Sequence, residues 1–370
     1  MTAREPVFKD ETITSRLRAL YGRYGYSQFR MRKFEEYDLY VRNKDFLISD
    51  SVITFTDTNG KLMALKPDVT FSIIKNNKYA PGTVQRYYYN ENVYRVSKDT
   101  QAFKEIMQTG LECVGDVGMY DECEVIMLAA RSLGTVSESY LLDLSHMGFL
   151  EGLFQSVALA LPLRKRILGL MESKNLPGIQ KLCAEAELGE ALAEKLCLLA
   201  GIYLPLDKAL EVIAPLVAGE GMQAAYDELV EIGKVMAVYG VSEKLYLDFS
   251  VVNDQNYYDG IIFKGFIDGI PDSVLSGGRY DRLLAKLGKK AKAIGFAVYL
   301  DRLERFGAEN AEYDVDVMLL YGKDEDQKAV IDTVKALTDA GNTVLAAREL
   351  DPSVRCRAVM RLENGEAKLL

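Results

Sequence analysis

The chain has 370 residues, 49% of them hydrophobic and 27% charged, which is the composition of an ordinary soluble globular protein. Its 45 Lys and Arg residues against 54 Asp and Glu residues give a formal net charge of −9. This acidic balance argues against a protein that binds nucleic acid along a broad basic surface, although it leaves room for one local basic groove. A single histidine, His146, excludes a metal site built from several histidines and a relay of two imidazoles.

The cysteines and the apolar runs indicate the cellular compartment of the protein. The five cysteines are odd in number and contain no C-x-x-C pair, which favours reduced, buried thiols over zinc ligands or a disulfide framework. They are Cys113, Cys123, Cys183, Cys197 and Cys356. The N-terminal residues contain no apolar signal core, and no apolar run reaches membrane-spanning length. We therefore expect a soluble, cytoplasmic protein without a metal ion or a cofactor.

The first part of the chain alternates between helical and extended patterns. Apolar residues at helical spacing predict a helix over 10–24. The Asn59-Gly60 pair, which lies between two strand-like runs, predicts a hairpin over 52–66. A second helix is expected to begin just after Pro67.

Two long strand-like segments follow, over 84–97 and 103–115. Only five polar or small residues, KDTQA, separate them. They predict an antiparallel pair with room for a ligand under the loop. A helix over 119–134 and a strand over 140–145 complete this part.

Residues 147–245 are rich in Leu, Ala, Glu and Lys and are punctuated by prolines, which predicts an inserted helical subdomain. Strand-like sequence patterns then return in three segments: 245–252, 257–267 and 272–281. A helix is expected over 279–288, and a strand that runs into a helix over 293–307. The C-terminal unit, 309–370, reads as strand, helix and strand with a short tail, one βαβ unit with parallel strands.

Six strings in a fixed order carry a family resemblance. They are LKPDVT, RYYYNENVYR, QTGLE, YYDGIIF, GGRYDRLLAKLG and GFAVYLDRL. The series resembles the catalytic domain of the class II aminoacyl-tRNA synthetases and, within that class, the histidyl enzyme. The resemblance implies an α+β fold with an antiparallel sheet of six or seven strands flanked by helices. The core would be 1–146 with 246–308, and 147–245 would be the insertion. Members of the family dimerise through the region that matches 25–40.

The candidate ligand site comes from two of these strings. Asp68 and Thr70 lie at an expected helix start, where a carboxylate and a hydroxyl could receive the ammonium group of an amino acid. Gln108 and Glu112 are four apart on a strand, so they share one face, with Gly110 between them keeping it open. A carboxamide and a carboxylate that are buried together need a polar partner.

The resemblance assigns histidine contact to six positions: Asp68, Thr70, Gln108, Glu112, Tyr258 and Tyr280. Several of these residues also have a purely structural interpretation. Asp68 could serve only as a helix cap, the two tyrosines could be core aromatics, and Gly277-Gly278 could be only a turn. His146 is open between a structural side chain and a contact.

Two arginines match positions that face a nucleotide in the synthetases. Arg95 stands at the first-motif arginine and Arg302 at the third-motif arginine. Both could contact phosphates, or both could pair with acids of the fold. The positions that follow Arg95 depart from the family, because Ser97 replaces an acid, and Ala102 or Lys104 replaces the next arginine.

Two further departures argue against adenylate chemistry. Asn253 stands where the synthetase has its catalytic arginine, and the loss of one preorganised donor typically costs about 2.7–4 kcal/mol of transition-state stabilisation. Tyr299 stands where the third motif has glycine, and its ring would crowd a nucleotide. The C-terminal unit is also shorter than an anticodon-binding domain. We therefore expect no adenylation and no tRNA partner.

A retained amino-acid pocket without the chemistry resembles the regulatory-subunit family of ATP phosphoribosyltransferase, the first enzyme of histidine biosynthesis. KPDVT and LDLSHMG resemble the corresponding strings of that family. The resemblance implies a non-catalytic chain that activates a short-form catalytic subunit in a hetero-octamer and carries histidine feedback. Two alternatives stay open: a truncated histidyl-tRNA synthetase-like enzyme that activates an amino acid, and a scaffold that binds no ligand.

Overall fold

The computed structural model describes residues 9–41, 52–76, 79–96, 100, 102–252, 258–303, 313–363 and 365–370. The chain divides into two units. The larger unit spans Ile13–Arg302, and the smaller one contains Leu303–Leu370. The larger unit holds both the main sheet and the helical segment after it.

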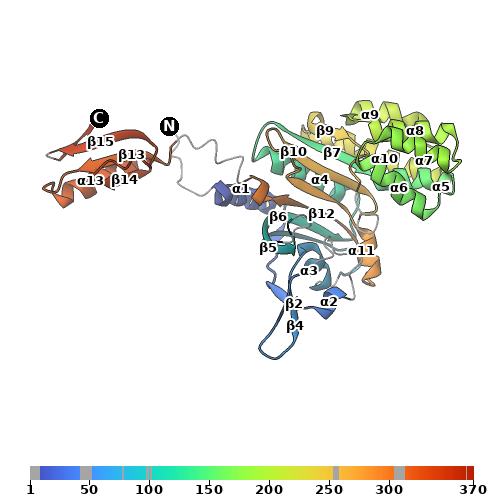
Figure 1. Ribbon diagram of the computed structural model, residues 1–370, viewed down its shortest axis with the longest axis horizontal. Helices are drawn as coiled ribbons and strands as arrows, with labels where there is room; N and C mark the ends of the chain where they lie inside the picture. Colours follow the sequence, from blue (N-terminus) through green and yellow to red (C-terminus); the bar gives the residue numbers. More distant parts are fainter. Residues whose placement is uncertain are drawn as a thin grey trace. The chain divides into compact units, whose positions relative to one another are not determined.

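Among the described residues of the larger unit, nine strands form one sheet in the order β1-β5-β6-β12-β11-β10-β7-β9-β8 (Figure 1). The six neighbours from β5 to β7 pair antiparallel, whereas β1 is parallel to β5 and β9 is parallel to β7. The bounds are Ser27–Gln28 (β1), Val84–Val96 (β5), Phe103–Gly115 (β6), Tyr140–His146 (β7), Leu204–Pro205 (β8), Leu245–Leu247 (β9), Ile261–Ile267 (β10), Leu275–Arg279 (β11) and Lys292–Tyr299 (β12). The α+β class is confirmed. The expected six or seven strands undercount the sheet, because edge strands of two or three residues are too short to show a period-two pattern.

Helices α1 and α4 cover one face of this sheet. α4 (Met119–Gly134) lies against β6, β7, β10 and β12 and buries almost all of its side chains. α1 (Lys9–Arg23) joins it, because the hydroxyl of Tyr21 lies 2.9 Å from that of Ser132 on α4. The Tyr21 ring also lies 6.1 Å from the ring of Phe296 on β12. The apolar residues Val125, Leu128 and Leu133 of α4 are buried here.

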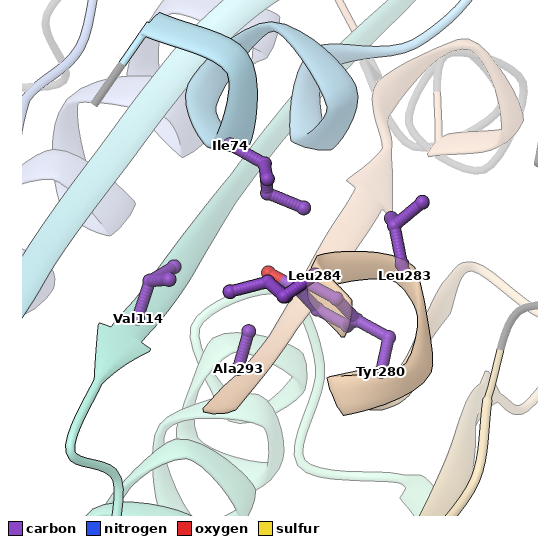
Figure 2. Close-up of a cluster of buried hydrophobic side chains, with 6 residues drawn as sticks. All are labelled: Ile74, Val114, Tyr280, Leu283, Leu284 and Ala293. Atoms are coloured by element: carbon purple, nitrogen blue, oxygen red, sulfur yellow. The ribbon is translucent and has the colours of Figure 1, made fainter. Parts of the chain in front are cut away.

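Helices α3 (Val69–Asn76) and α11 (Asp281–Lys286) cover the opposite face. Figure 2 shows the cluster that joins them to β6 and β12: Ile74, Val114, Tyr280, Leu283, Leu284 and Ala293. Successive residues of a strand point to opposite faces, so Gln108, Gly110 and Glu112 share the face of Val114. The prediction that they lie together on one face is confirmed.

The expected hairpin is present. β3 (Thr54–Thr56) pairs antiparallel with β4 (Leu62–Leu65), and Gly60 takes a left-handed φ of +80° in the turn. The Oδ1 atom of Asp57 accepts backbone N–H groups of Asn59 and Lys61, each at 2.8 Å. A third strand, β2 (Phe34–Glu36), pairs with β4, and the short helix α2 (Asp38–Val41) follows it.

The segment after β7 is helical, as its composition predicts. Six α-helices gather beside the β7–β9 end of the sheet (Figure 1). They are α5 (Met147–Ser156), α6 (Leu161–Glu172), α7 (Leu176–Glu185), α8 (Glu190–Gly201), α9 (Leu206–Ile213) and α10 (Gly219–Tyr239). Pro162 and Pro177 lie in the first turns of α6 and α7, where a missing N–H costs nothing. α10 packs on α5 and α4 and so joins the segment to the core.

The C-terminal unit contains more sheet than expected. β13 (Val315–Tyr321) and β14 (Val344–Ala347) are parallel and joined through α13 (Gln327–Asp339), which confirms the βαβ unit. Two further strands, β15 (Cys356–Glu363) and β16 (Glu366–Leu369), extend it to the order β14-β13-β15-β16. The expected short tail was therefore wrong. β15 carries Arg357 and Arg361 among its apolar residues, so its sequence lacks a clear strand pattern, although Gly365, which has a left-handed φ of +82°, lies between β15 and β16.

Two further expectations concern the burial of the cysteines and the presence of membrane-spanning helices. All five cysteines are free thiols, but only Cys113, Cys123 and Cys183 are buried, so the expected burial is wrong for Cys197 and Cys356. Across the described residues, the structure contains no helix that is both long and apolar enough to cross a membrane.

The packing of α4 predicts which face stabilises the larger unit. Leu128 on α4 is fully buried, so Leu128→Ala should lower the free energy of unfolding by about 2–5 kcal/mol. Val238→Ala on α10 is the control, because its side chain is 87% exposed and its loss should change stability by less than about 0.5 kcal/mol. Urea denaturation followed by circular dichroism measures both, and equal midpoints would contradict the packing described here.

Candidate functional site

A cavity of about 120 Å³ lies on the α3 face of the sheet. The six residues that the sequence singled out all line it: Asp68, Thr70, Gln108, Glu112, Tyr258 and Tyr280. Arg95, Ser276 and Tyr299 also line it. These residues come from α3, β5, β6, β11 and β12 and from the segments beside them, so only the fold brings them together.

The floor of the cavity is built from small residues in register. Gly110 pairs with Ala297 across β6 and β12, and Glu112 pairs with Gly295. A Cβ atom on Gly295 would lie 1.8 Å from the Oε2 atom of Glu112, and one on Gly278 would lie 2.8 Å from the ring of Tyr258. Glycine at these two positions leaves the space that the polar side chains occupy.

Glu112 is the central acid of the cavity. The residue is 2% exposed, and its carboxyl group accepts hydrogen bonds from the hydroxyl of Thr70 at 2.5 Å and from the hydroxyl of Tyr280. Burial raises the pKa of Glu112 to about 8, and the nearby Asp68 carboxylate adds to the rise, against the two hydroxyl donors. Without a cation in the cavity, Glu112 is therefore largely protonated at neutral pH.

Asp68 has two roles at once. It precedes α3, and its Oδ1 atom accepts the backbone N–H of Phe71 at 2.8 Å, so it does cap the helix. It is also buried and lines the cavity, and burial raises its pKa. The cap explains how the carboxylate is held in place, and it leaves Asp68 beside any ligand in the cavity.

Both tyrosines line the cavity, and both pack in one core cluster, Tyr280 as a buried member and Tyr258 as a partly buried neighbour. Tyr280 is buried in the cluster of Figure 2, yet its hydroxyl reaches Glu112. The rings of Tyr258 and Tyr280 meet edge to face, with 6.5 Å between their centroids. Packing on one side therefore fixes the hydroxyl that faces the cavity on the other.

The two arginines differ in position. Arg95 lines the cavity, and its Nε atom donates to the carbonyl of Pro67 at 3.0 Å. Arg302 is not part of the cavity lining. It donates to the carbonyl of Ser273, and its guanidinium stacks 4.6 Å above the ring of Tyr299. The hydroxyl of Tyr299 in turn lies 2.7 Å from that of Ser276.

Other positions that the sequence singled out lie elsewhere. His146 is buried outside the cavity lining, with its Nε2 atom 3.2 Å from Glu228 on α10. Ala102 and Lys104 are exposed near the start of β6. Ser97 and Asn253 lie outside the described residues. Sequence reasoning missed Ser276 and Gly295, whose roles depend on the pairing of β11, β12 and β6, which one sequence does not reveal.

Comparison with known proteins shows which family the chain resembles. A family model described as histidyl-tRNA synthetase matches residues 5–303. An ATP phosphoribosyltransferase regulatory subunit from Syntrophotalea carbinolica is 30% identical over 348 residues, which cover 90% of this chain and 80% of that protein. The subunit of the same name from Oceanobacillus iheyensis is 27% identical over 302 residues, 81% of this chain and 74% of that protein.

Solved structures agree on the fold. The chain resembles a Bacillus halodurans protein described as an ATP phosphoribosyltransferase regulatory subunit/histidyl-tRNA synthetase, with a TM-score of 0.75, 24% identity and coverage of 95% and 93% of the two chains. It also resembles a chain of the ATP phosphoribosyl transferase (HisG:HisZ) complex from Thermotoga maritima, with a TM-score of 0.62, 18% identity and coverage of 78% and 96%. The chain therefore belongs to the histidyl-tRNA synthetase family and, within it, to the ATP phosphoribosyltransferase regulatory subunits.

Proposed function

We propose that this chain is a non-catalytic regulatory subunit of ATP phosphoribosyltransferase, which binds free histidine in the cavity under α3 and conveys its presence to a catalytic subunit. The observation that carries the proposal is the pairing of two buried carboxyl groups, Asp68 and Glu112, in one cavity with Thr70 and Gln108. Buried acids of this kind need a cationic or hydrogen-bonding partner.

Histidine matches this cavity in charge and in hydrogen bonding. Its ammonium group and its imidazole N–H are donors, and Asp68, Glu112 and the carboxamide of Gln108 supply acceptors. The edge-to-face tyrosine pair supplies flat apolar walls for the imidazole ring. The amino acid would replace the tyrosine hydroxyl as a donor to Glu112.

The surroundings of the cavity support a non-catalytic role. Transfer to ATP needs preorganised cations around phosphate oxygens. Arg302 donates to the carbonyl of Ser273 and stacks on the ring of Tyr299. In the sequence, the neutral Asn253 stands where the resemblance to the synthetases places a catalytic arginine. Of the two motif arginines, only Arg95 lines the cavity.

The partner follows from the family. The relatives above are named regulatory subunits, and one similar chain was solved in a complex of ATP phosphoribosyl transferase. We propose a short-form catalytic subunit as the partner in a cytoplasmic hetero-octamer, with homodimers formed through the region 25–40 and no tRNA bound. The alternative is a truncated histidyl-tRNA synthetase-like enzyme, which Arg95 at the cavity favours.

Histidine affinity should depend on Glu112 and Gln108. Glu112→Gln keeps the shape and removes the negative charge, so the dissociation constant should rise about 10- to 100-fold, the worth of a charge-assisted hydrogen bond. Gln108→Ala should weaken binding in the same direction. Glu105→Gln, the same change at an exposed position of β6, is the matched control in calorimetric titrations. Unchanged affinity in Glu112→Ala and Gln108→Ala would rule out this cavity as the histidine site.

Histidine binding should release a proton and strengthen as the pH rises. The pKa of Glu112 is about 8 in the ligand-free protein, so a cationic ligand must bind the deprotonated minority at pH 7. Affinity should therefore increase about fivefold between pH 7 and pH 8 and level off above that. Calorimetry in buffers of different ionisation enthalpy measures the released proton directly. Glu112→Gln should abolish this release, and a release that persists in that variant would place the titrating group elsewhere.

Reconstitution tests the regulatory role itself. Mixing this chain with the short-form catalytic subunit of the same source should make phosphoribosyl-ATP formation dependent on this chain, and histidine should suppress it. The assay follows phosphoribosyl-ATP with each subunit alone as the control. A catalytic subunit that is indifferent to this chain would contradict the proposal. Histidine-dependent exchange of pyrophosphate into ATP would instead favour the synthetase-like alternative.

A further inference from the structure

A cluster of charged side chains lies directly behind the wall of the cavity, centred on Arg279 at the end of β11. Its guanidinium contacts carboxylates from three different elements. The Nη2 atom lies 2.7 Å from Asp281, and the Nη1 atom lies 3.0 Å from Glu122 on α4 and 3.9 Å from Glu228 on α10. Arg279 is thus a direct link between the edge of the cavity and the helical segment.

Carboxyl groups outnumber cations in this cluster. Burial raises the pKa of Glu122 to about 8, and the neighbouring Glu228 adds to the rise, against the pull of Arg279. Burial acts in the same direction on Glu228, but its contacts with His146 and Arg279 hold its pKa below the usual value. The two acids therefore compete for one proton and for one guanidinium.

The cluster also has an unmet hydrogen bond. Among the described residues, the Nδ1 atom of His146 is buried without a hydrogen-bond partner, whereas Glu122 and Glu228 share a hydrogen bond through one proton. One proton and one guanidinium distributed among several acids can be paired in more than one way. A packed element with two alternative pairings is what coupling between sites requires.

Tyr280 connects the cluster to the cavity through the backbone. It follows Arg279 in the chain, and its hydroxyl donates to Glu112 inside the cavity. Its backbone N–H donates to the carbonyl of Ala293 at 2.9 Å, and the carbonyl of Arg279 accepts the backbone N–H of Asp259 at 3.1 Å. Consecutive residues at the end of a strand point to opposite faces. The Tyr280 hydroxyl and the Arg279 guanidinium therefore lie on opposite faces of one strand end and are connected by a single peptide bond.

We propose that Arg279 is a positioning residue that couples occupancy of the cavity to helix α10 by exchanging its contacts between Glu122 and Glu228. This coupling depends on the proposed function only for the identity of the ligand, histidine. A ligand that takes Glu112 from Tyr280 frees that hydroxyl and shifts the segment 279–281. Arg279 then redistributes its contacts, and α10, a helix of 21 residues, carries the change along its length.

The test is a hydrogen-exchange cycle on the full chain without any ligand. Tyr280→Phe removes only the hydroxyl that Glu112 accepts, and it should change the exchange rates of α10 amides around Glu228 by about fivefold or more. In the background Glu228→Gln, Tyr280→Phe should change them by less than about twofold, because the link to α10 is already broken. Glu231→Gln is the matched control, the same change on an exposed residue of the same helix, and it should leave the full effect of Tyr280→Phe in place.

A second variant guards against a local packing effect at Tyr280. Arg279→Lys keeps the charge and loses the fork that reaches two acids, so it should also alter α10 exchange and should suppress the response to Tyr280→Phe. Unchanged α10 exchange in Tyr280→Phe would overturn the coupling, and so would an effect that persists in Glu228→Gln or Arg279→Lys.

Hydrogen exchange in the presence of histidine tests the coupling and the histidine site separately. Histidine should reproduce the change in α10 exchange seen with Tyr280→Phe, and Glu228→Gln should remove it while histidine still binds. Binding without any α10 response would overturn the coupling and leave the histidine site standing. If histidine does not bind, the proposed ligand is wrong, and the ligand-free cycle still decides whether Arg279 links the cavity to α10.

Discussion

The burial of Glu112 on the face of an antiparallel sheet is the constraint on which the site depends. An isolated carboxyl group in this position is costly, and the structure offsets that cost with hydroxyl donors from Thr70 and Tyr280 and by a raised pKa. Space for the carboxyl group exists only because its cross-strand neighbour is Gly295. The buried position of Glu112 therefore depends both on its two hydroxyl donors and on the glycine that leaves space for it.

The two faces of the sheet are packed differently. The face under α1 and α4 buries the apolar run Val125–Ala130 of α4, and it also holds the charged cluster around Arg279. The face under α3 and α11 contains the cavity, and the cluster around Tyr280 packs beside it.

The end of strand β11 connects the cavity to the helices around it. β11 ends at Arg279, the next residue completes the cavity, and the one after it begins α11. A cavity wall, an ionic link to α10 and a helix start thus lie within three consecutive residues. This arrangement is consistent with the proposed regulatory role, in which a ligand in the cavity would change contacts at α10. The stacking of Arg302 on Tyr299 agrees with that view, because it withdraws a cation from any phosphate.

Much of this organisation could be read from the amino-acid sequence. Local patterns were enough for the hairpin at Asn59-Gly60, the long pair β5–β6, helix α4 and the helical text after His146, because turn chemistry and hydrophobic periodicity act within a few residues. Period two along β6 was also enough to place Gln108 and Glu112 on one face.

Other features depend on contacts between segments far apart in the chain, which no local pattern records. These include the short edge strands, the hairpin β15–β16, the pairing of Gly295 with Glu112 and the separation of Arg302 from the cavity. The sequence by itself determined which polar residues are available for the cavity, because residue type and periodicity are local. Only the tertiary structure decided that six of them line one cavity and that Arg279 joins it to α10, because register and helix docking follow from packing of the whole chain.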